Sequence, residues 1–150
     1  MDLQSTALDQ PQATARTVAD RLRPAAKAGW SPIPDVLIFN QGTLGLRSED
    51  LNVLLNLIAH WYLPGTTPFV RPTTIARRMG VSTRSVQRSI ARLIREKFVT
   101  KTKHPTNGHV AYDLTPMVEK LKPLAEARVA HRQSLREAKL VELAQAIEEN

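Results

Sequence analysis

Four arginines recur at spacings of three and four residues in one short stretch of this 150-residue chain. At about 100° per residue they share one arc of a helix expected from Thr83 to about Lys97. They are Arg84, Arg88, Arg92 and Arg95. The opposite arc is apolar and consists of Val86, Ile90, Leu93 and Ile94. Guanidinium groups bind phosphate and make bidentate contacts with guanine edges, so this face indicates nucleic-acid binding. The alternative is an arginine-rich surface that serves only solubility.

The residues before this helix have the pattern of a helix-turn-helix. A short helix is expected over 74–79, and Gly80 should end it, because glycine tolerates the left-handed conformation of a helix C-terminus. Ser82 is a suitable N-cap for the second helix. Ala76 is small enough to let the two helices cross closely, and Val86 supplies an apolar anchor ten positions later. The arginine helix is therefore the expected recognition helix.

A β-hairpin is expected directly after the recognition helix. The segment 98–103 alternates as a strand, the Asn-Gly pair at 107–108 is a strong turn signal, and 109–114 returns as a second strand. Lys101 and Lys103 fall on one face of the first strand, where they would meet the phosphate backbone. A recognition helix that runs into a basic hairpin is typical of a winged helix-turn-helix.

Two sets of residues are therefore candidate contacts with DNA. The set expected to read bases lies at the start of the recognition helix and comprises Thr83, Arg84, Ser85, Gln87 and Arg88. The set expected to contact the DNA backbone comprises Arg71, Thr73, Arg77, Arg78, Arg92, Lys101, Lys103, His104, Asn107 and His109. The two wing histidines could in principle hold a metal ion. No carboxylate or cysteine accompanies them, so no metal is expected.

Positive charge is concentrated in the same part of the chain. The 21 lysines and arginines outnumber the 14 acids, and the segment 65–112 contains ten of them with one acid, Glu96. This segment therefore carries +9 and the rest of the chain −2. The distribution favours a polyanionic partner at this one segment, and double-stranded DNA fits the motif there.

Other functional classes find little support in the sequence. The chain has no cysteine, which excludes disulfides, thiolate metal sites and a cysteine nucleophile. No glycine-rich phosphate loop, paired-carboxylate motif or Ser/His/Asp set is legible, so neither an enzyme nor a cofactor is expected. No apolar run approaches the roughly 20 residues that span a bilayer, and the first residues lack signal-peptide features. We therefore expect a cytoplasmic, nucleoid-associated protein without membrane contact.

Three regions are expected along the chain. Residues 1–30 contain few large apolar side chains and should form a flexible tail. Residues 31–115 should form the winged helix-turn-helix domain, and residues 116–150 a C-terminal helical arm. The expected fold class is mainly α, with a small β-hairpin wing and a long C-terminal helix.

Two segments precede the helix-turn-helix. The apolar run 36–39 fits a short strand and one helical turn equally well. A largely buried helix should follow, with Ser48 as its N-cap and with Glu49 and Asp50 at the end where the helix dipole favours negative charge. Its apolar stripe extends to Trp61 or Tyr62, and the Pro-Gly pair at 64–65 should end it.

The C-terminal arm has a strong helical pattern interrupted by one proline. We expect a short helix over 116–122 and a second, long helix that starts near Pro123. No single heptad register holds throughout. The residues expected to mediate dimerisation are Leu135, Leu140, Leu143 and Ile147. The alternatives are a helix that packs on its own domain and a frayed tail.

A resemblance to known families is carried by the stretch IARRMGVSTRSVQRSIARLIREKFV, which is similar to the winged helix-turn-helix of bacterial regulators of the GntR and MarR type. A longer resemblance runs from Ile33-Pro34 through LGLRSEDLNVLLNLIAHWY to YDLTPMV. This stretch is similar to helix-turn-helix proteins of plasmids, phages and mobile elements, including N-terminal domains of replication-associated proteins. The resemblance covers roughly 30–121 and implies binding of double-stranded DNA. At Lys97 many relatives have a glycine.

Three functions follow as hypotheses. The first is a homodimeric, sequence-specific transcriptional regulator. The second is a replication-associated protein of a plasmid, phage or mobile element, whose head binds origin DNA while the C-terminal helix docks a protein partner. The third is an RNA-binding or purely architectural protein. A footprint at a promoter, a footprint on origin repeats, and indifference to DNA sequence distinguish them.

Overall fold

The computed structural model describes residues 20–63 and 65–148 and separates into two compact units, with the division after Pro32. The first unit is described from residue 20 and contains a 3-10 helix, η1 (Ala25–Ala28). Arg23 forms an ion pair with Asp20 in this unit. Most of the tail expected over residues 1–30 lies outside the described residues.

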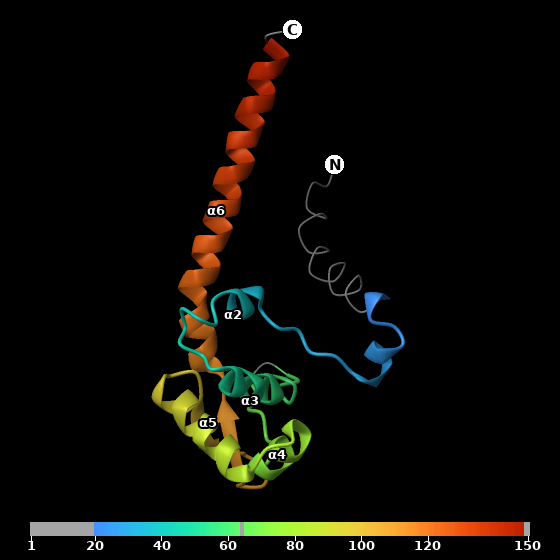
Figure 1. Ribbon diagram of the computed structural model, residues 1–150, viewed down its shortest axis with the longest axis vertical. Coiled ribbons are helices and arrows are strands. Elements are labelled where there is room, and N and C mark those ends of the chain that lie inside the picture. The colour runs from blue at the N-terminus through green and yellow to red at the C-terminus, as the bar shows by residue number, and fades with distance from the viewer. Residues whose placement is uncertain (1–19, 64, 149–150) are drawn as a thin grey trace. The chain divides into compact units, whose positions relative to one another are not determined.

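The second unit, from Ile33 onward, consists of helices and one antiparallel hairpin (Figure 1). Its elements in order are α2 (Asp35–Phe39), α3 (Ser48–Ile58), α4 (Pro72–Met79), α5 (Thr83–Arg95), β1 (Thr100–Lys103), β2 (Val110–Asp113) and α6 (Thr115–Glu148). The expected fold class, mainly α with a hairpin and a long C-terminal helix, is confirmed. The run 36–39, for which strand and helix were both open, is helical and buries Val36 and Leu37.

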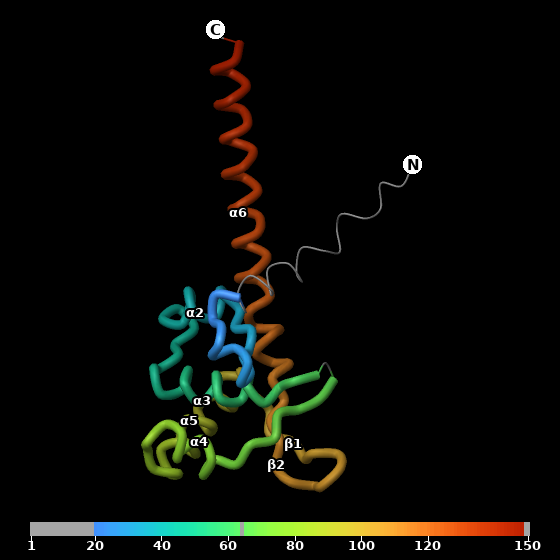
Figure 2. The backbone as a smooth tube through the Cα atoms, turned by 90° about the vertical axis from the view of Figure 1, so that its right-hand side faces the viewer, coloured from blue at the N-terminus to red at the C-terminus, as the bar shows by residue number. Residues whose placement is uncertain are grey.

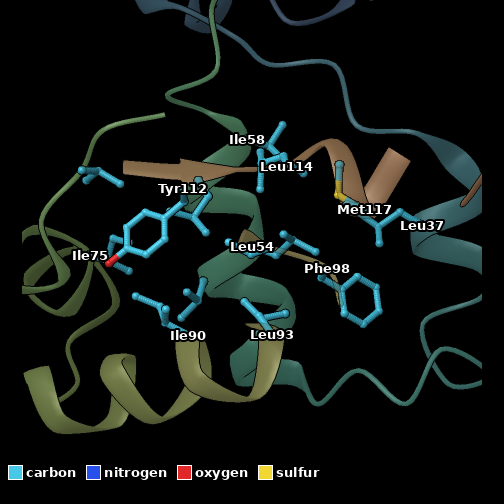
Figure 3. Close-up of a cluster of buried hydrophobic side chains, with 14 of the residues drawn as sticks. Leu37, Leu54, Ile58, Ile75, Ile90, Leu93, Phe98, Tyr112, Leu114 and Met117 are labelled. Carbon is cyan, nitrogen blue, oxygen red and sulfur yellow. The ribbon is translucent and has the colours of Figure 1, made fainter. Parts of the chain in front are cut away.

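A single hydrophobic core joins α3, α4, α5, the hairpin and the first turns of α6 (Figure 3). Leu54, Ile75 and Leu93 each bring a helix into this core and are at most 1% exposed. Tyr112 and Met117 add contacts from β2 and α6. Burying a large apolar side chain stabilises a fold by roughly 1.5–3 kcal/mol, so this cluster holds the relative positions of the helices.

The turn between α4 and α5 confirms the expected helix-turn-helix signals. Gly80 follows α4 with φ of 68°, and its N–H donates to the carbonyl of Ala76. Ser82 is the N-cap of α5, and its Oγ accepts a hydrogen bond from the backbone N–H of Ser85 at 3.1 Å. The chain thus reverses direction between two helices whose ends are both satisfied.

Helix α3 begins and ends differently from the expectation. Ser48 is its first residue, Arg47 occupies the N-cap position, and no side chain caps this end. The helix stops at Ile58, so Trp61 and Tyr62 lie in the loop that follows. Tyr62 is 77% exposed there, which removes it from the core that the helical spacing suggested.

Helix α6 is continuous through Pro123, whereas a break was expected there. Proline in a helix interior removes one backbone hydrogen bond and costs about 3 kcal/mol or more. Leu121 is buried just before Pro123, and Leu124 packs against the same core just after it. These contacts keep the helix in register on both sides of the backbone hydrogen bond that Pro123 removes. Their packing energy offsets the free-energy cost of the proline.

The start of α6 is fastened to the end of α5. Lys120 donates from Nζ to the backbone carbonyl of Glu96 at 2.6 Å, and its ammonium lies 4.2 Å from the ring centroid of Phe98. A cation at a helix C-terminus satisfies an orphan carbonyl and complements the helix dipole. Helices α5 and α6 are therefore connected at this point by a charged hydrogen bond as well as by the core.

Lys97 has a left-handed backbone, with φ of 59°, at the junction of α5 and β1. This conformation costs an L-residue roughly 1–2 kcal/mol, whereas glycine adopts it freely.

We expect Lys97→Gly to raise the free energy of unfolding by about 0.5–1 kcal/mol in urea denaturation, because the relief of strain exceeds the added chain entropy. Lys97→Ala keeps the strain and should leave stability unchanged. Equal effects of both variants would contradict the strain.

Candidate nucleic-acid interface

The outer face of α5 carries three of the polar side chains that the sequence placed at the candidate site. Arg84, Gln87 and Arg88 are all exposed, and Thr83 and Ser85 are half-buried at the same end of the helix. The Oγ of Ser85 accepts a hydrogen bond from the Oγ of Ser82 at 3.1 Å, which ties Ser85 to the N-cap. In the described residues no hydrogen bond or ion pair engages Arg84, Gln87 or Arg88, so this face is available to a ligand.

Helix α4 and the hairpin lie at the same end of the second unit as α5 (Figure 2). Arg71 is the N-cap residue of α4, and Thr73 lies in its first turn. Both side chains are exposed, as is that of Arg77. The N-terminus of a helix presents free N–H groups and a positive partial charge, so this end of α4 suits a phosphate group.

Arg92 does not face solvent with the other arginines, and this expectation is corrected. Its Nη2 and Nε lie 2.7 and 3.0 Å from Oδ1 of Asp50 on α3, and its Nη2 also donates to Oγ of Ser89 at 3.1 Å. The side chains of Arg92 and Asp50 are 21% and 5% exposed. Asp50, expected as a helix-dipole charge, is instead one half of a buried ion pair between α3 and α5. This guanidinium is already occupied and is not a free phosphate contact.

The ion pair changes the protonation of both partners. Burial by itself raises the pKa of Asp50, but the hydrogen bonds from Arg92 and Ser89 and the charge of Arg92 outweigh it, and the pKa falls below its ordinary value. The hydrogen bond to Asp50 raises the pKa of Arg92 against the opposing effect of burial. The pair is therefore ionised at neutral pH, and it fixes how α5 lies on α3.

Arg78 has a partner of its own at the end of α3. Its Nη1 lies 2.8 Å from Nε2 of His60. Burial, and then the charge of Arg78, lower the pKa of His60, so the imidazole is neutral and accepts this hydrogen bond. Part of the hydrogen-bonding capacity of Arg78 is thus directed toward the protein rather than outward.

The hairpin presents the wing lysines as the alternation predicted. Lys101 pairs in register with Tyr112, and Lys103 pairs with Val110. Both lysines are exposed, while Tyr112 is buried and burial raises the pKa of its phenol. The Oδ1 of Asn107 accepts a hydrogen bond from the N–H of His109 at 3.0 Å. The tip is thereby held in a defined turn.

An aromatic contact that the sequence did not reveal connects the wing tip to α4. Phe69 precedes α4, and its ring stacks on His109 with centroids 5.4 Å apart and lies 5.9 Å from His104. The carbonyl of Pro68 accepts a hydrogen bond from the N–H of Tyr112 at 3.0 Å, so this segment runs along β2. The only signal of this contact in the sequence is the apolar pair Phe69-Val70 before the helix.

In the described residues no group of three His, Cys, Asp or Glu side chains could hold a metal ion.

We expect Phe69→Ala to loosen the wing tip without unfolding the domain. Aromatic pairs contribute about 0.5–1.5 kcal/mol, which corresponds to roughly 2- to 10-fold faster hydrogen exchange. The amides to monitor are those of His104 and Gly108, which donate to His109 and His104 respectively. Amides in α5 serve as internal controls, and Val110→Ala is a matched loss of an exposed wing side chain. Unchanged exchange at the tip would show that Phe69 does not hold it.

Comparison with known proteins then assigns the family. A family model described as the DnaD N-terminal domain matches residues 33–132. The chain belongs to the DnaD N-terminal domain family. The match begins where the second unit begins, and it ends within α6, so residues 133–148 of that helix lie beyond it. The resemblance to GntR and MarR regulators is corrected to membership of the DnaD N-terminal domain family.

One solved structure has the same fold, and a second is more weakly similar. The crystal structure of the N-terminal domain of DnaD protein from Geobacillus kaustophilus HTA426 is 24% identical, with a TM-score of 0.53, covering 79% of this chain and 96% of that one. The YusO protein from Bacillus subtilis is 19% identical, with a TM-score of 0.39, covering 94% and 99%. A search of curated protein sequences finds no significant match.

No helix in the described part of this DnaD-family chain is both long and apolar enough to cross a membrane.

Proposed function

We propose that this protein is a replication-associated DNA-binding protein that binds duplex DNA with its helix-turn-helix and wing. The observation that carries the proposal is the unoccupied face of α5, where Arg84, Gln87 and Arg88 project together from a helix held at both ends. Membership of the DnaD N-terminal domain family favours replication over transcriptional regulation. The proposal makes the protein a binding module and not an enzyme, with no cofactor, acting at the nucleoid in the cytoplasm.

In this proposal α5 enters the major groove with its N-terminal end foremost. Arg84 and Arg88 would each span two acceptors of a guanine, and Gln87 would pair with an adenine edge. Thr83 and Ser85 border that face. The backbone contacts would come from α4 and the wing, namely Arg71, Thr73, Arg77, Arg78, Lys101, Lys103, His104, Asn107 and His109. Arg92 is left out of this set because Asp50 holds it.

The experiment that tests this function is selection of genomic duplex fragments at near-physiological salt, followed by sequencing of the fragments retained. Iterated repeats at a replication origin are the expected result. Enrichment of a palindrome at promoters would favour a transcriptional regulator instead. Retention without a motif would show that the basic face grips phosphate alone, and better competition by structured RNA would overturn duplex binding.

We also propose that the protein acts as a homodimer through α6. A second binding head raises the affinity of a module that contacts only a few base pairs. A replication protein as a second partner of the same helix is the remaining alternative, and the two are distinguished by whether the isolated protein self-associates.

A further inference from the structure

The outer part of α6 carries positive charge on one side and most of its acids on the other. At about 100° per residue, Arg128, Arg132 and Lys139 lie within about 40° of one another around the helix, and Arg136 lies about 40° further on. These four side chains are all exposed, and we call them the basic stripe. The acids on the opposite side lie about 160–200° from Arg128 and are Glu119, Glu126, Glu137 and Glu148.

The basic stripe is an unfavourable arrangement for the helix itself. Arg128, Arg132 and Arg136 follow one another at four-residue spacing, and like charges at this spacing destabilise a helix. Glutamates at that spacing would stabilise it, but within the described residues no ion pair engages a member of the stripe. Glu142, three residues after Lys139, is the one described acid of α6 beside the stripe. A bound polyanion would relieve the repulsion.

The basic stripe begins where α6 passes α2. The guanidinium of Arg128 lies 4.7 Å from the ring centroid of Phe39, a contact that leaves its N–H groups able to bind an anion. Helices α4 and α5 lie at the opposite end of the second unit from the last turns of α6 (Figure 1). The stripe starts about 12 Å beyond Lys120, which contacts the end of α5, and continues for about 16 Å. It is therefore a basic surface separate from the exposed face of α5.

We propose that the basic stripe binds the phosphate backbone of duplex DNA, without regard to base sequence. Three of its members are arginines, whose planar guanidinium groups match phosphate oxygens. Duplex DNA carries about one negative charge per 1.7 Å of its axis, so a stripe of about 16 Å meets phosphates in any register. An acidic protein segment would need a matching run of carboxylates.

This inference goes beyond the proposed helix-turn-helix contact, because it adds a second surface that binds DNA. DNA held by α5 would raise the local concentration of phosphate near the basic stripe. Arg136 and Lys139 lie beyond the residues that the family model matches, so membership of the family does not account for the complete stripe.

The apolar residues expected to mediate dimerisation lie beside the basic stripe. Leu140, Leu143 and Ile147 are about 60–120° around the helix from Arg128, all on one side of it. Leu135 lies about 20° to the other side of Arg128, so it does not share an arc with Leu140. All four leucine and isoleucine side chains are between 51% and 77% exposed. A pair formed through the first three would leave the stripe accessible from the side of Arg128.

The salt dependence of binding to a scrambled duplex of about 40 base pairs, roughly 140 Å long, tests the proposal. The full-length variant combines Arg132→Gln, Arg136→Gln and Lys139→Gln and so removes three cations. Each phosphate contact contributes about 0.9 to the slope of log K against log salt, so the slope should fall by about 2.7. Between about 50 and 200 mM salt, the affinity of the wild type should then fall about 40-fold more than that of the variant. An unchanged slope would overturn the proposal.

Two lysines of α6 provide matched single variants. Lys139 lies in the basic stripe, and Lys122 is also exposed but lies about 100° away around the helix. Lys139→Gln should reduce the slope by about 1, and Lys122→Gln should leave it unchanged. Equal reductions would overturn the proposal, because net charge alone would then determine binding.

Two further measurements separate the basic stripe from the other proposals. The stripe variants should sediment as the wild type does, and a change of slope found only together with lost self-association would overturn the proposal. They should also keep the preference for a duplex enriched in the genomic selection over the scrambled one. Failure of the stripe alone leaves that preference intact. Failure of the proposed function abolishes the preference but leaves the difference in slope between wild type and stripe variant.

Discussion

Arg84→Ala and Arg88→Ala will each weaken binding to the selected duplex by about 1–3 kcal/mol, or roughly 5- to 150-fold. The reason is that a bidentate guanidinium contact satisfies two acceptors on one guanine, and alanine leaves both unpaired in the groove. Neither side chain has a partner within the described protein, so removal should not affect folding. Fluorescence anisotropy against the selected duplex and a scrambled duplex of equal length measures the effect.

Lys101→Ala is the matched comparison, since Lys101 is also exposed but lies on the wing. It should weaken the selected and scrambled duplexes alike and reduce the slope of log K against log salt by about 1. The arginine variants should instead reduce the preference for the selected sequence. Arginine variants that lose both duplexes equally would mean that Arg84 and Arg88 bind phosphate and do not read bases.

Asp50→Ala will have the largest effect on stability, lowering the free energy of unfolding by about 3 kcal/mol. It removes the carboxylate that Arg92 contacts and leaves a mostly buried guanidinium unpaired between α3 and α5. The effect lies at the lower end of the usual range for buried pairs, because about a fifth of the Arg92 side chain reaches water. Urea denaturation followed by circular dichroism measures it.

The same pair gives the wild type a specific acid sensitivity. Since the folded pKa of Asp50 is lowered, its stabilisation is complete above the ordinary value near 3.8 and is lost as the pH falls below that value. The difference in stability between wild type and Asp50→Ala should therefore be constant from pH 7 to about 5 and shrink in more acidic solution.

Two further variants make the test specific. Glu96→Ala removes an exposed acid whose contact with Arg95 is 3.5 Å, and it should change stability by less than about 0.5 kcal/mol. Asp50→Leu combined with Arg92→Met should recover much of the loss, because an apolar pair leaves no charge buried. A Glu96→Ala variant as unstable as Asp50→Ala would show that the pair has no special role.

The local signals in the sequence predicted the helix-turn-helix and the hairpin well. The apolar arc of α5, the glycine after α4 and the capping Ser82 each depend on residues only a few positions apart. The Asn-Gly turn is equally local, and the hairpin forms around it. For these elements propensity, periodicity and capping all indicate the same structure.

Contacts between distant residues were not predictable in the same way. Arg92 and Asp50 are 42 residues apart, and helical periodicity alone placed Arg92 with the solvent-facing arginines. Pro123 is a local helix breaker whose effect is overcome by the packing of Leu121 and Leu124. The stacking of Phe69 on His109 depends on how a segment before α4 meets the wing, which no short pattern specifies.

The bond from Lys120 to the last turn of α5 has a mechanical consequence. Because it joins α6 to the end of α5, where Leu121 also packs into the shared core, the first turns of α6 have a defined direction relative to α5. Adding one residue to α6 beyond Lys122 would advance the outer helix by about 1.5 Å and rotate it by about 100° relative to the head. Adding seven residues would restore the rotation to within about 20° while lengthening the arm by roughly 10 Å. Each residue added to α6 therefore changes the direction of its outer face relative to α5 by about 100°, a larger effect than the accompanying change in length.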